Sequence, residues 1–177
     1  MSVPGATVAS VTKFHAIHTE RLILRPLRQD DRADVVRIQS DPATNQFNPD
    51  PPDAEQAGKQ FEYWLSHWEE HGYGYFAVVE AATGELVGVG GVQSKEMHDE
   101  KLLNLYYRFR AESWGKGYAT EMASAAVEWA EREIPERPVV ISVALINKPS
   151  RRVAEKLGFT PYLEEDYHGL RSTHYRR

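Results

Sequence analysis

The sequence contains no cysteine, which excludes a disulfide framework, a thiolate zinc site, an iron–sulfur cluster and a cysteine nucleophile. No apolar run approaches the roughly 18 residues of a membrane-spanning helix, and residues 1–11 lack the basic flank and apolar centre of a signal peptide. Positive charge is not in excess either, because the formal net charge is −5. A general nucleic-acid-binding protein usually needs a basic face. We therefore expect a cytoplasmic protein that binds neither nucleic acid nor a membrane and acts on something small.

The remaining composition is that of one globular domain. The chain has 177 residues, 41% of them hydrophobic and 27% charged. At this length roughly 70% of the unfolded surface can be buried, so a core forms without crosslinks. We interpret residues 1–18 as a loosely ordered leader and residues 19–177 as one domain.

Hydrophobic periodicity and turn signals predict seven strands and four helices in a mixed α/β (α+β) arrangement. The strands are expected at 21–25, 75–79, 86–92, 102–109, 139–146, 159–167 and 172–176. The helices are expected from Asp30 or Asp31 to Ser40 with Ala33, Val36 and Ile38 on the apolar face, from Ala57 to Gly72, from Ala119 to Pro135, and from Pro149 to Gly158. No repeat or linker divides the chain.

The segment 114–121 carries the sharpest chemical signal, because it joins a strand to an amphipathic helix through Gly115 and Gly117. Glycine lets the backbone approach a ligand closely, and the free N–H groups of a helix start attract phosphate. Lys116 adds a cation. The alternative is a plain turn whose glycines only permit a positive φ. The spacing is not that of a P-loop.

Other groups of residues have a chemical and a structural interpretation. His67 and His71 lie one helical turn apart, as in a metal pair, but Trp68 stands where a zincin has glutamate, so an exposed polar helix face is favoured. Ser150 opens a helix after a buried strand and is a natural N-cap. Four tyrosines fit a substrate groove, although such residues more often pack in a core: Tyr73, Tyr75, Tyr106 and Tyr107.

Four stretches together resemble the GCN5-related N-acetyltransferase (GNAT) superfamily, in particular its branch similar to the ribosomal-protein N-terminal acetyltransferases (RimJ/RimL-like). They are Thr-Glu-Arg-Leu-Ile-Leu-Arg-Pro-Leu at 19–27, Thr-Gly-Glu-Leu-Val-Gly at 83–88, Trp-Gly-Lys-Gly-Tyr-Ala-Thr-Glu at 114–121, and Asn-Lys-Pro-Ser at 147–150 running on to Leu-Gly-Phe at 157–159. They occur in family order and span about residues 19–176. The last two stretches are specific in combination.

The resemblance implies a twisted mixed sheet, flanked by helices, that splays open between the strands at 102–109 and 139–146. Acetyl-CoA would lie in this gap as co-substrate, with no metal, and the amine would enter near the loop 45–53 and the helix 54–71. The loop at 115–120 would bind the pyrophosphate. The main chain at the end of the strand at 102–109 would pair with the pantetheine arm, and a side chain on the opposite wall would hydrogen-bond the same arm. The residues in these three roles would be Gly115, Lys116, Gly117, Tyr118, Ala119 and Thr120, then Phe109 and Arg110, then Asn147.

Two positions depart from the family pattern. Relatives often carry a glutamate base where this chain has Asn104, and many carry a tyrosine acid where it has Ala154. The resemblance leaves Ser150 as the candidate general acid, because it matches a serine proposed for that role in the ribosomal branch. The base is not identified, and Glu100, Glu164, Glu165 or a chain of waters could supply it.

The resemblance implies transfer of an acetyl group to a primary amine by direct attack in a ternary complex. At pH 7 roughly a tenth of an α-amine is neutral, against about four in ten thousand lysine side chains. Without a strong base the favoured acceptor is a peptide N-terminal α-amine or a small amine of low pKa. The competing hypotheses are a non-catalytic acyl-CoA-binding sensor of the same fold and a metallohydrolase built on His67 and His71. A homodimer is left open.

Overall fold

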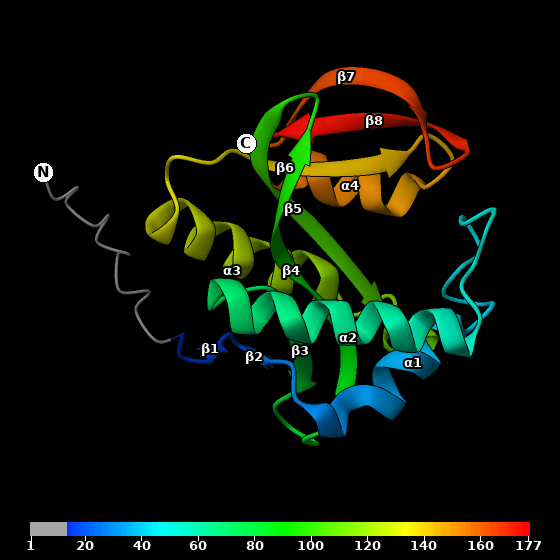
Figure 1. Ribbon diagram of the computed structural model, residues 1–177, viewed down its shortest axis with the longest axis vertical. Helices are drawn as coiled ribbons and strands as arrows, with labels where there is room; N and C mark the ends of the chain where they lie inside the picture. The colour runs from blue at the N-terminus through cyan, green and yellow to red at the C-terminus, as the bar shows by residue number, and fades with distance from the viewer. Residues whose placement is uncertain (1–13) are drawn as a thin grey trace, which may run out of the picture.

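The computed structural model describes residues 14–177 as one mixed sheet with helices on both faces (Figure 1). The sheet has eight strands in the order β1-β2-β3-β4-β5-β6-β8-β7. The strands are β1 (Ile17–His18), β2 (Leu22–Pro26), β3 (Tyr75–Glu80), β4 (Leu86–Met97), β5 (Glu100–Phe109), β6 (Val139–Ala144), β7 (Thr160–Tyr167) and β8 (Leu170–Arg176). The helices are η1 (Gln29–Asp31), α1 (Arg32–Ser40), α2 (Ala54–His71), η2 (Ala111–Ser113), α3 (Tyr118–Glu133) and α4 (Lys148–Lys156). The expected mixed α/β fold is confirmed.

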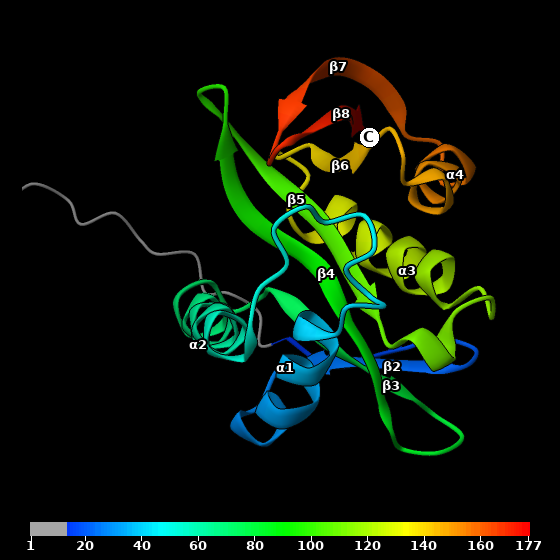
Figure 2. The ribbon, with the colours of Figure 1, turned by 90° about the vertical axis from the view of Figure 1, so that its right-hand side faces the viewer.

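Each face of the sheet has its own hydrophobic core. Figure 2 shows α1 and α2 on one side of the central strands and α3 and α4 on the other. Met122 and Ala126 of α3 pack with Leu105 of β5. Phe61 and Trp64 of α2 belong to the second core. Because side chains alternate along a strand, successive residues of β5 serve opposite faces.

The sheet opens between β5 and β6. These two strands are parallel and pair only at Leu103 with Val139 and at Asn104 with Val140. Farther along the chain β5 stays paired with β4 as far as Phe109, while β6 pairs with β8. The other edges of β5 and β6 therefore separate into the gap that the family resemblance implies.

Residues 14–18, assigned to a loosely ordered leader on the sequence, are packed into the fold. Residues 1–13 lie outside the described part of the chain, so this part of the interpretation stays a prediction. Phe14, however, packs against Trp68, Phe76 and Trp129 with ring centroids 5.2–5.6 Å apart. Ile17 and His18 form β1 beside β2. Composition gave no signal for this strand, because its two residues are held by pairing rather than by local periodicity.

The first helix differs from its prediction in two details. Val35, not Val36, is buried with Ile38, and Ala33 is exposed. The Asp31 carboxylate caps no turn of α1. Its two oxygens accept hydrogen bonds from the two terminal nitrogens of the Arg25 guanidinium at 2.8 Å, and one of them also accepts from the Arg28 N–H. This bidentate ion pair fixes β2 against the start of α1.

Among the described residues no helix is both long enough and apolar enough to cross a bilayer.

Candidate functional site

A cleft of about 550 Å³ occupies the opening between β5 and β6. Its walls come from the end of β5, the loop before α3, the start of α4 and residues 44–48 of the α1–α2 loop. This volume is in the range of small-molecule and cofactor sites. Eight of the predicted site residues line it: Phe109, Gly115, Gly117, Tyr118, Ala119, Thr120, Asn147 and Ser150. Arg110 and Lys116 lie outside its lining.

The loop before α3 presents unused main-chain donors to the cleft. Gly117 is the N-cap of α3 and has φ of +80°, a left-handed conformation that favours glycine. The first intrahelical hydrogen bond at this end runs from the Glu121 N–H to the Gly117 carbonyl. The N–H groups of Tyr118, Ala119 and Thr120 therefore have no acceptor within the helix. Together with the helix dipole they favour an anion here.

A side-chain network pins this loop to the segment just before β2. The Glu121 carboxylate accepts hydrogen bonds from the Thr19 hydroxyl at 2.7 Å and from the Arg21 N–H and Nε at 2.7 and 2.8 Å. Arg21 also donates to the Lys116 carbonyl at 2.7 Å. Burial pushes the pKa of Glu121 upward, but the Thr19 and Arg21 contacts outweigh it and leave the pKa lowered. Two of the motifs of the sequence, 19–27 and 114–121, are thus joined to each other.

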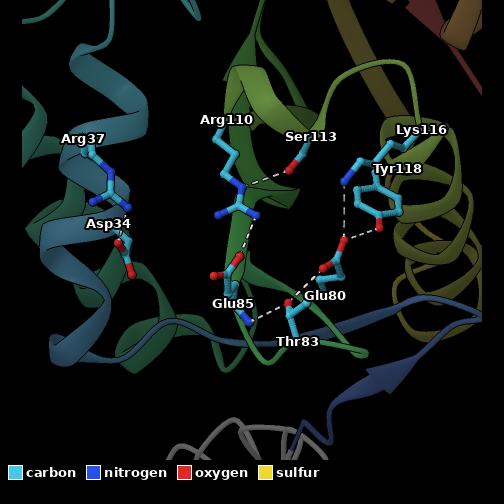
Figure 3. Close-up of polar contacts among 9 residues, drawn as sticks. All are labelled: Asp34, Arg37, Glu80, Thr83, Glu85, Arg110, Ser113, Lys116 and Tyr118. Carbon is cyan, nitrogen blue, oxygen red and sulfur yellow. Dashed lines mark hydrogen bonds and ion pairs between the residues drawn. The ribbon is translucent and has the colours of Figure 1, made fainter.

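A second network lies beside the loop and is drawn in Figure 3. The Tyr118 hydroxyl donates to Glu80, and the Lys116 ammonium lies 3.8 Å from the same carboxylate. These contacts, with the Thr83 hydroxyl bond, lower the pKa of Glu80. Lys116 is therefore held beside a carboxylate rather than inside the cleft, although its position on the loop keeps it next to the anion-binding turn.

Arg110 serves the fold rather than the cleft. Its N–H donates to the Val87 carbonyl at 2.9 Å, and its carbonyl accepts from Ser113 N–H at 3.0 Å. Its guanidinium pairs with Glu85 at 2.8 Å and bonds the Ser113 hydroxyl (Figure 3). Both main-chain groups of Arg110 thus have partners within the chain, and the expected pairing of Arg110 with pantetheine stays a prediction.

Alternation along β5 identifies the groups that are open instead. The Leu103 N–H points toward β6, where it donates to the Pro138 carbonyl. Residues of the same parity present their main-chain groups to the same edge, so Tyr107 and Phe109 face the opening. The Phe109 carbonyl accepts from the Trp114 indole at 3.0 Å, which leaves its N–H. An extended ligand can pair there as an added strand.

Ser150 is not the helix cap that local sequence favours. Asn147 is the N-cap of α4, and its Oδ1 accepts from the Ser150 N–H at 3.2 Å. The Ser150 hydroxyl instead accepts from the Tyr107 hydroxyl, 3.0 Å away across the cleft. Burial raises the pKa of Tyr107 although this bond opposes the shift, so the phenol stays protonated at neutral pH. Sequence reasoning missed Tyr107 as a partner, because its neighbour in space is 43 residues away.

The two departures from the family pattern have plain structural roles. Asn104 donates to the Tyr75 hydroxyl at 2.8 Å, and Ala154 is buried in the α3-side core. The three carboxylates considered as bases stand outside the cleft lining and make ionic contacts of their own: Glu100 with Arg176, Glu164 with Arg171, and Glu165 with His98 and His174. No carboxylate of the described chain lines the cleft.

His67 is not on an exposed polar face, as the sequence favoured. It is buried, and its Nδ1–H donates to the Tyr73 carbonyl at 2.9 Å while Nε2 accepts from the Ser94 N–H at 3.3 Å. His71 stacks on it with ring centroids 4.2 Å apart. Within residues 14–177 no three His, Cys, Asp or Glu side chains gather as a metal site would require. His67 is thus held by hydrogen bonds within the fold, and the His71 ring lies against it.

Of the four tyrosines, Tyr73 and Tyr75 are core residues with 8% and 7% exposure. Tyr106 bonds the Gln39 side chain on the α1 face at 2.9 Å. Tyr107 alone of the four lines the cleft of the described chain.

Comparison with known proteins agrees with this geometry. The sequence pattern of the acetyltransferase (GNAT) domain matches residues 21–160. YkkB of Bacillus subtilis is 29% identical over 145 residues, which are 79% of this chain and 82% of YkkB. An acetyltransferase structure from Agrobacterium tumefaciens is 27% identical and superposes with a TM-score of 0.77, covering 94% of this chain and 95% of that one.

A third relative was solved with a ligand. RimL, a ribosomal L7/L12 alpha-N-protein acetyltransferase in complex with coenzyme A, superposes with a TM-score of 0.76 at 19% identity, covering 92% of this chain and 97% of RimL. At this identity the likeness concerns the fold. The family match covers most of the chain, from Arg21 just before β2 to Thr160 at the start of β7. The chain therefore belongs to the GNAT acetyltransferase family and is an N-acetyltransferase.

Proposed function

We propose that the cleft between β5 and β6 binds acetyl-CoA and that the bound acetyl group passes directly to a primary amine. The observation that carries the proposal is one continuous cleft with anion-binding N–H groups at one end and the Tyr107–Ser150 pair in its wall. RimL, with the same fold, was solved with coenzyme A.

The loop Gly115–Thr120 would receive the pyrophosphate. Its turn leaves the N–H groups of Tyr118, Ala119 and Thr120 free, and Arg21 holds the loop in shape through the Lys116 carbonyl. Lys116 would add positive charge from beside Glu80. The Phe109 N–H would pair with the pantetheine arm, and the Asn147 amide N–H₂ would donate to it from the opposite side, since only the Asn147 Oδ1 is occupied by the cap.

The neutral acceptor amine attacks the thioester carbonyl carbon and forms the carbon–nitrogen bond. The carbon–sulfur bond breaks, the sulfur leaves with the electron pair, and the surplus proton of the nitrogen passes to the thiolate or to water. A donor aimed at the sulfur lowers this barrier. Ser150 is the candidate, because its oxygen accepts from Tyr107 and its own proton is then free to point elsewhere. Tyr107 would orient that hydroxyl. The serine would act by hydrogen-bonding the sulfur or by relaying a proton from water.

The favoured acceptor is an amine that is partly neutral without help. No carboxylate lines the described cleft, and Asn104 bonds Tyr75 where relatives often hold a base. A peptide α-amine or a small amine of low pKa suits such a site, since about a tenth of an α-amine is already neutral at pH 7. The name of RimL as an alpha-N-protein acetyltransferase supports this choice.

Release of free thiol from acetyl-CoA over a panel of amines and peptides tests the proposal, with mass spectrometry of each product. We expect thiol release that depends on the amine and a gain of one acetyl group on nitrogen. Binding of CoA without turnover of any amine would instead favour the acyl-CoA-binding sensor, for which Asn104 and Ala154 speak.

A further inference from the structure

The cleft has one charged side chain in the described part of its lining, Arg108. Side-chain alternation along β5 sends Arg108 to the face opposite Tyr107 and Phe109, toward the loop that joins α1 to α2. There it borders Thr44, Gln46 and Asn48 of the same cleft. The anion-binding loop and Ser150 belong to the α3–α4 side. Arg108 is therefore placed at the acceptor end rather than at the phosphate end.

Arg108 forms no ion pair with a described carboxylate, unlike three other arginines of the fold. Arg21, Arg25 and Arg110 each form an ion pair with a carboxylate at 2.7–2.8 Å. Within residues 14–177 no carboxylate lies within ion-pair distance of the half-buried Arg108. Its Nη1 donates a hydrogen bond to the neutral Oδ1 of Asn45. A guanidinium has five donors in a planar fork, so donors remain for a ligand.

Asn45 holds the Arg108 guanidinium beside residues 44–48, several of which line the cleft with it. The buried Asn45 amide donates to the Gln39 and Asp41 carbonyls at 2.7 and 2.8 Å, which fixes the orientation of its oxygen. The Tyr106 ring lies 6.0 Å from the Arg108 guanidinium carbon and covers another side. A half-buried cation without a counter-ion costs folding free energy, and a bound anion offsets that cost.

We propose that Arg108 binds a carboxylate of the acceptor, so that the substrate is an amine with a carboxylate close by, such as an amino acid or a peptide with an acidic residue beside its α-amine. The inference rests on the proposed acetyl transfer. Planar bidentate pairing with a guanidinium suits a carboxylate. An acceptor with several positive charges is disfavoured, because no acidic side chain of the described lining would meet them.

Matched acceptor pairs test this inference. One arm compares free amino acids with their amides, and the other compares peptides that differ only by Asp or Asn at the second position. A carboxylate next to an amine raises the amine pKa and lowers its neutral fraction, so chemistry alone favours the amide in the first arm. We expect the acid of each accepted pair to have the higher kcat/KM. A larger acid-to-amide ratio of kcat/KM in the first arm would identify a free amino acid as the substrate. A larger ratio in the second arm would identify a peptide.

Variants assign the preference to one side chain. Arg108→Gln keeps a donor for Asn45 but loses the charge, and we expect the acid-to-amide ratio to fall by about 10- to 100-fold with KM for acetyl-CoA unchanged. Arg108→Glu should reverse the preference toward amides. Arg137→Gln is the control, since Arg137 also bonds a neutral group, the Ser94 hydroxyl at 2.6 Å, outside this cleft.

Several results would overturn the inference. The inference would be wrong if the wild-type protein acetylated the amides as efficiently as the acids, and no variant would be needed to show it. Arg108 would have another role if the acid-to-amide ratio were unchanged in Arg108→Gln. The same holds if this variant raised KM for acetyl-CoA instead of lowering the ratio. If neutral or cationic amines were acetylated and carboxylate-bearing amines were not, this inference would be wrong, but the proposed acetyl transfer would stand. Absence of turnover with every amine would remove the proposed function itself, and this inference with it.

Discussion

At the scale of single residues, Ser150 shows how a local signal can point to the wrong role. Its place after a buried strand favours an N-cap, but Asn147 takes that position and the serine hydroxyl turns to Tyr107. The contact joins β5 to α4, and nothing in the spacing of residues 107 and 150 announces it. Sequence could nominate Ser150 only through the family resemblance.

Ser150→Ala should lower kcat at least about tenfold, because general-acid assistance is typically worth 10²–10⁴-fold. The melting temperature and KM for acetyl-CoA should be nearly kept, since the cap belongs to Asn147. Tyr107→Phe should lower kcat less. If the two act as a unit, the double variant is no slower than Ser150→Ala alone. Full kcat in folded Ser150→Ala would remove the serine from the mechanism.

His67 provides a pH test of stability. Burial and the neighbouring His71 lower the pKa of His67 below its ordinary value, so the folded protein keeps the ring neutral. The unfolded chain takes up this proton as pH falls below about 6.5. The His67 contribution to the free energy of unfolding is therefore present above that pH and is lost on acidification.

Denaturant titrations from pH 8 to 5 should show this loss in the wild type and a shallower decline in His67→Gln. The exposed His15→Gln serves as control and should follow the wild type. An equally steep decline in His67→Gln would show that another group causes the acid sensitivity.

At the scale of elements, the sequence predicted most strands and helices because each has its own periodicity and its own start or stop signal. Helix α2 begins after its N-cap Asp53 and ends at Gly72, which has φ of +74°. Aspartate and glycine are residue types that commonly start and end helices. Strand β1 was missed, and so was the burial of His67, because both depend on neighbours from elsewhere in the chain.

The Arg21 network makes a prediction about the loop before α3. Arg21→Ala removes the bond to the Lys116 carbonyl and leaves the Glu121 charge uncompensated beside the anion-binding turn. We expect KM for acetyl-CoA to rise about tenfold. The change in stability should be small, because the Arg21 side chain is 43% exposed and solvent screens its ion pair.

Adding Glu121→Gln to Arg21→Ala should recover part of the lost affinity, because it removes the repelling charge. Arg32→Ala, which breaks an exposed ion pair with Glu62, is the matched control. Unchanged KM in Arg21→Ala would show that the loop holds its shape without this contact.

At the scale of the whole molecule, the opening between β5 and β6 determines what the protein can do. The family resemblance implied the opening and its place, and the short β5–β6 pairing confirms both. The sequence could not single out Arg108 as a binding residue, because that role depends on which charged side chains of the described fold surround it in space. Nor could sequence reveal that Arg110 is engaged with Val87 and Ser113.

A cleft without a carboxylate predicts selectivity for amines. A peptide with a free N-terminus should be acetylated faster near pH 7 than its N-blocked twin that offers only a lysine. The neutral fractions differ by a few hundredfold, and the advantage should shrink as pH rises toward 10. Parallel rate measurements on the twins decide the matter, and faster reaction of the blocked peptide would reveal a base outside the described cleft lining.

The most direct test of the central claim, that the cleft binds CoA by the N–H groups at the start of α3, is calorimetric titration of CoA into Gly117→Glu. The glutamate would fill the space of the phosphates with the wrong charge. Gly84→Glu is the matched control, since Gly84 has φ +74° and open space around its Cβ position. We predict that Gly117→Glu loses CoA binding at least about 100-fold while folded Gly84→Glu binds as the wild type does. Wild-type affinity in a folded Gly117→Glu protein would contradict the claim.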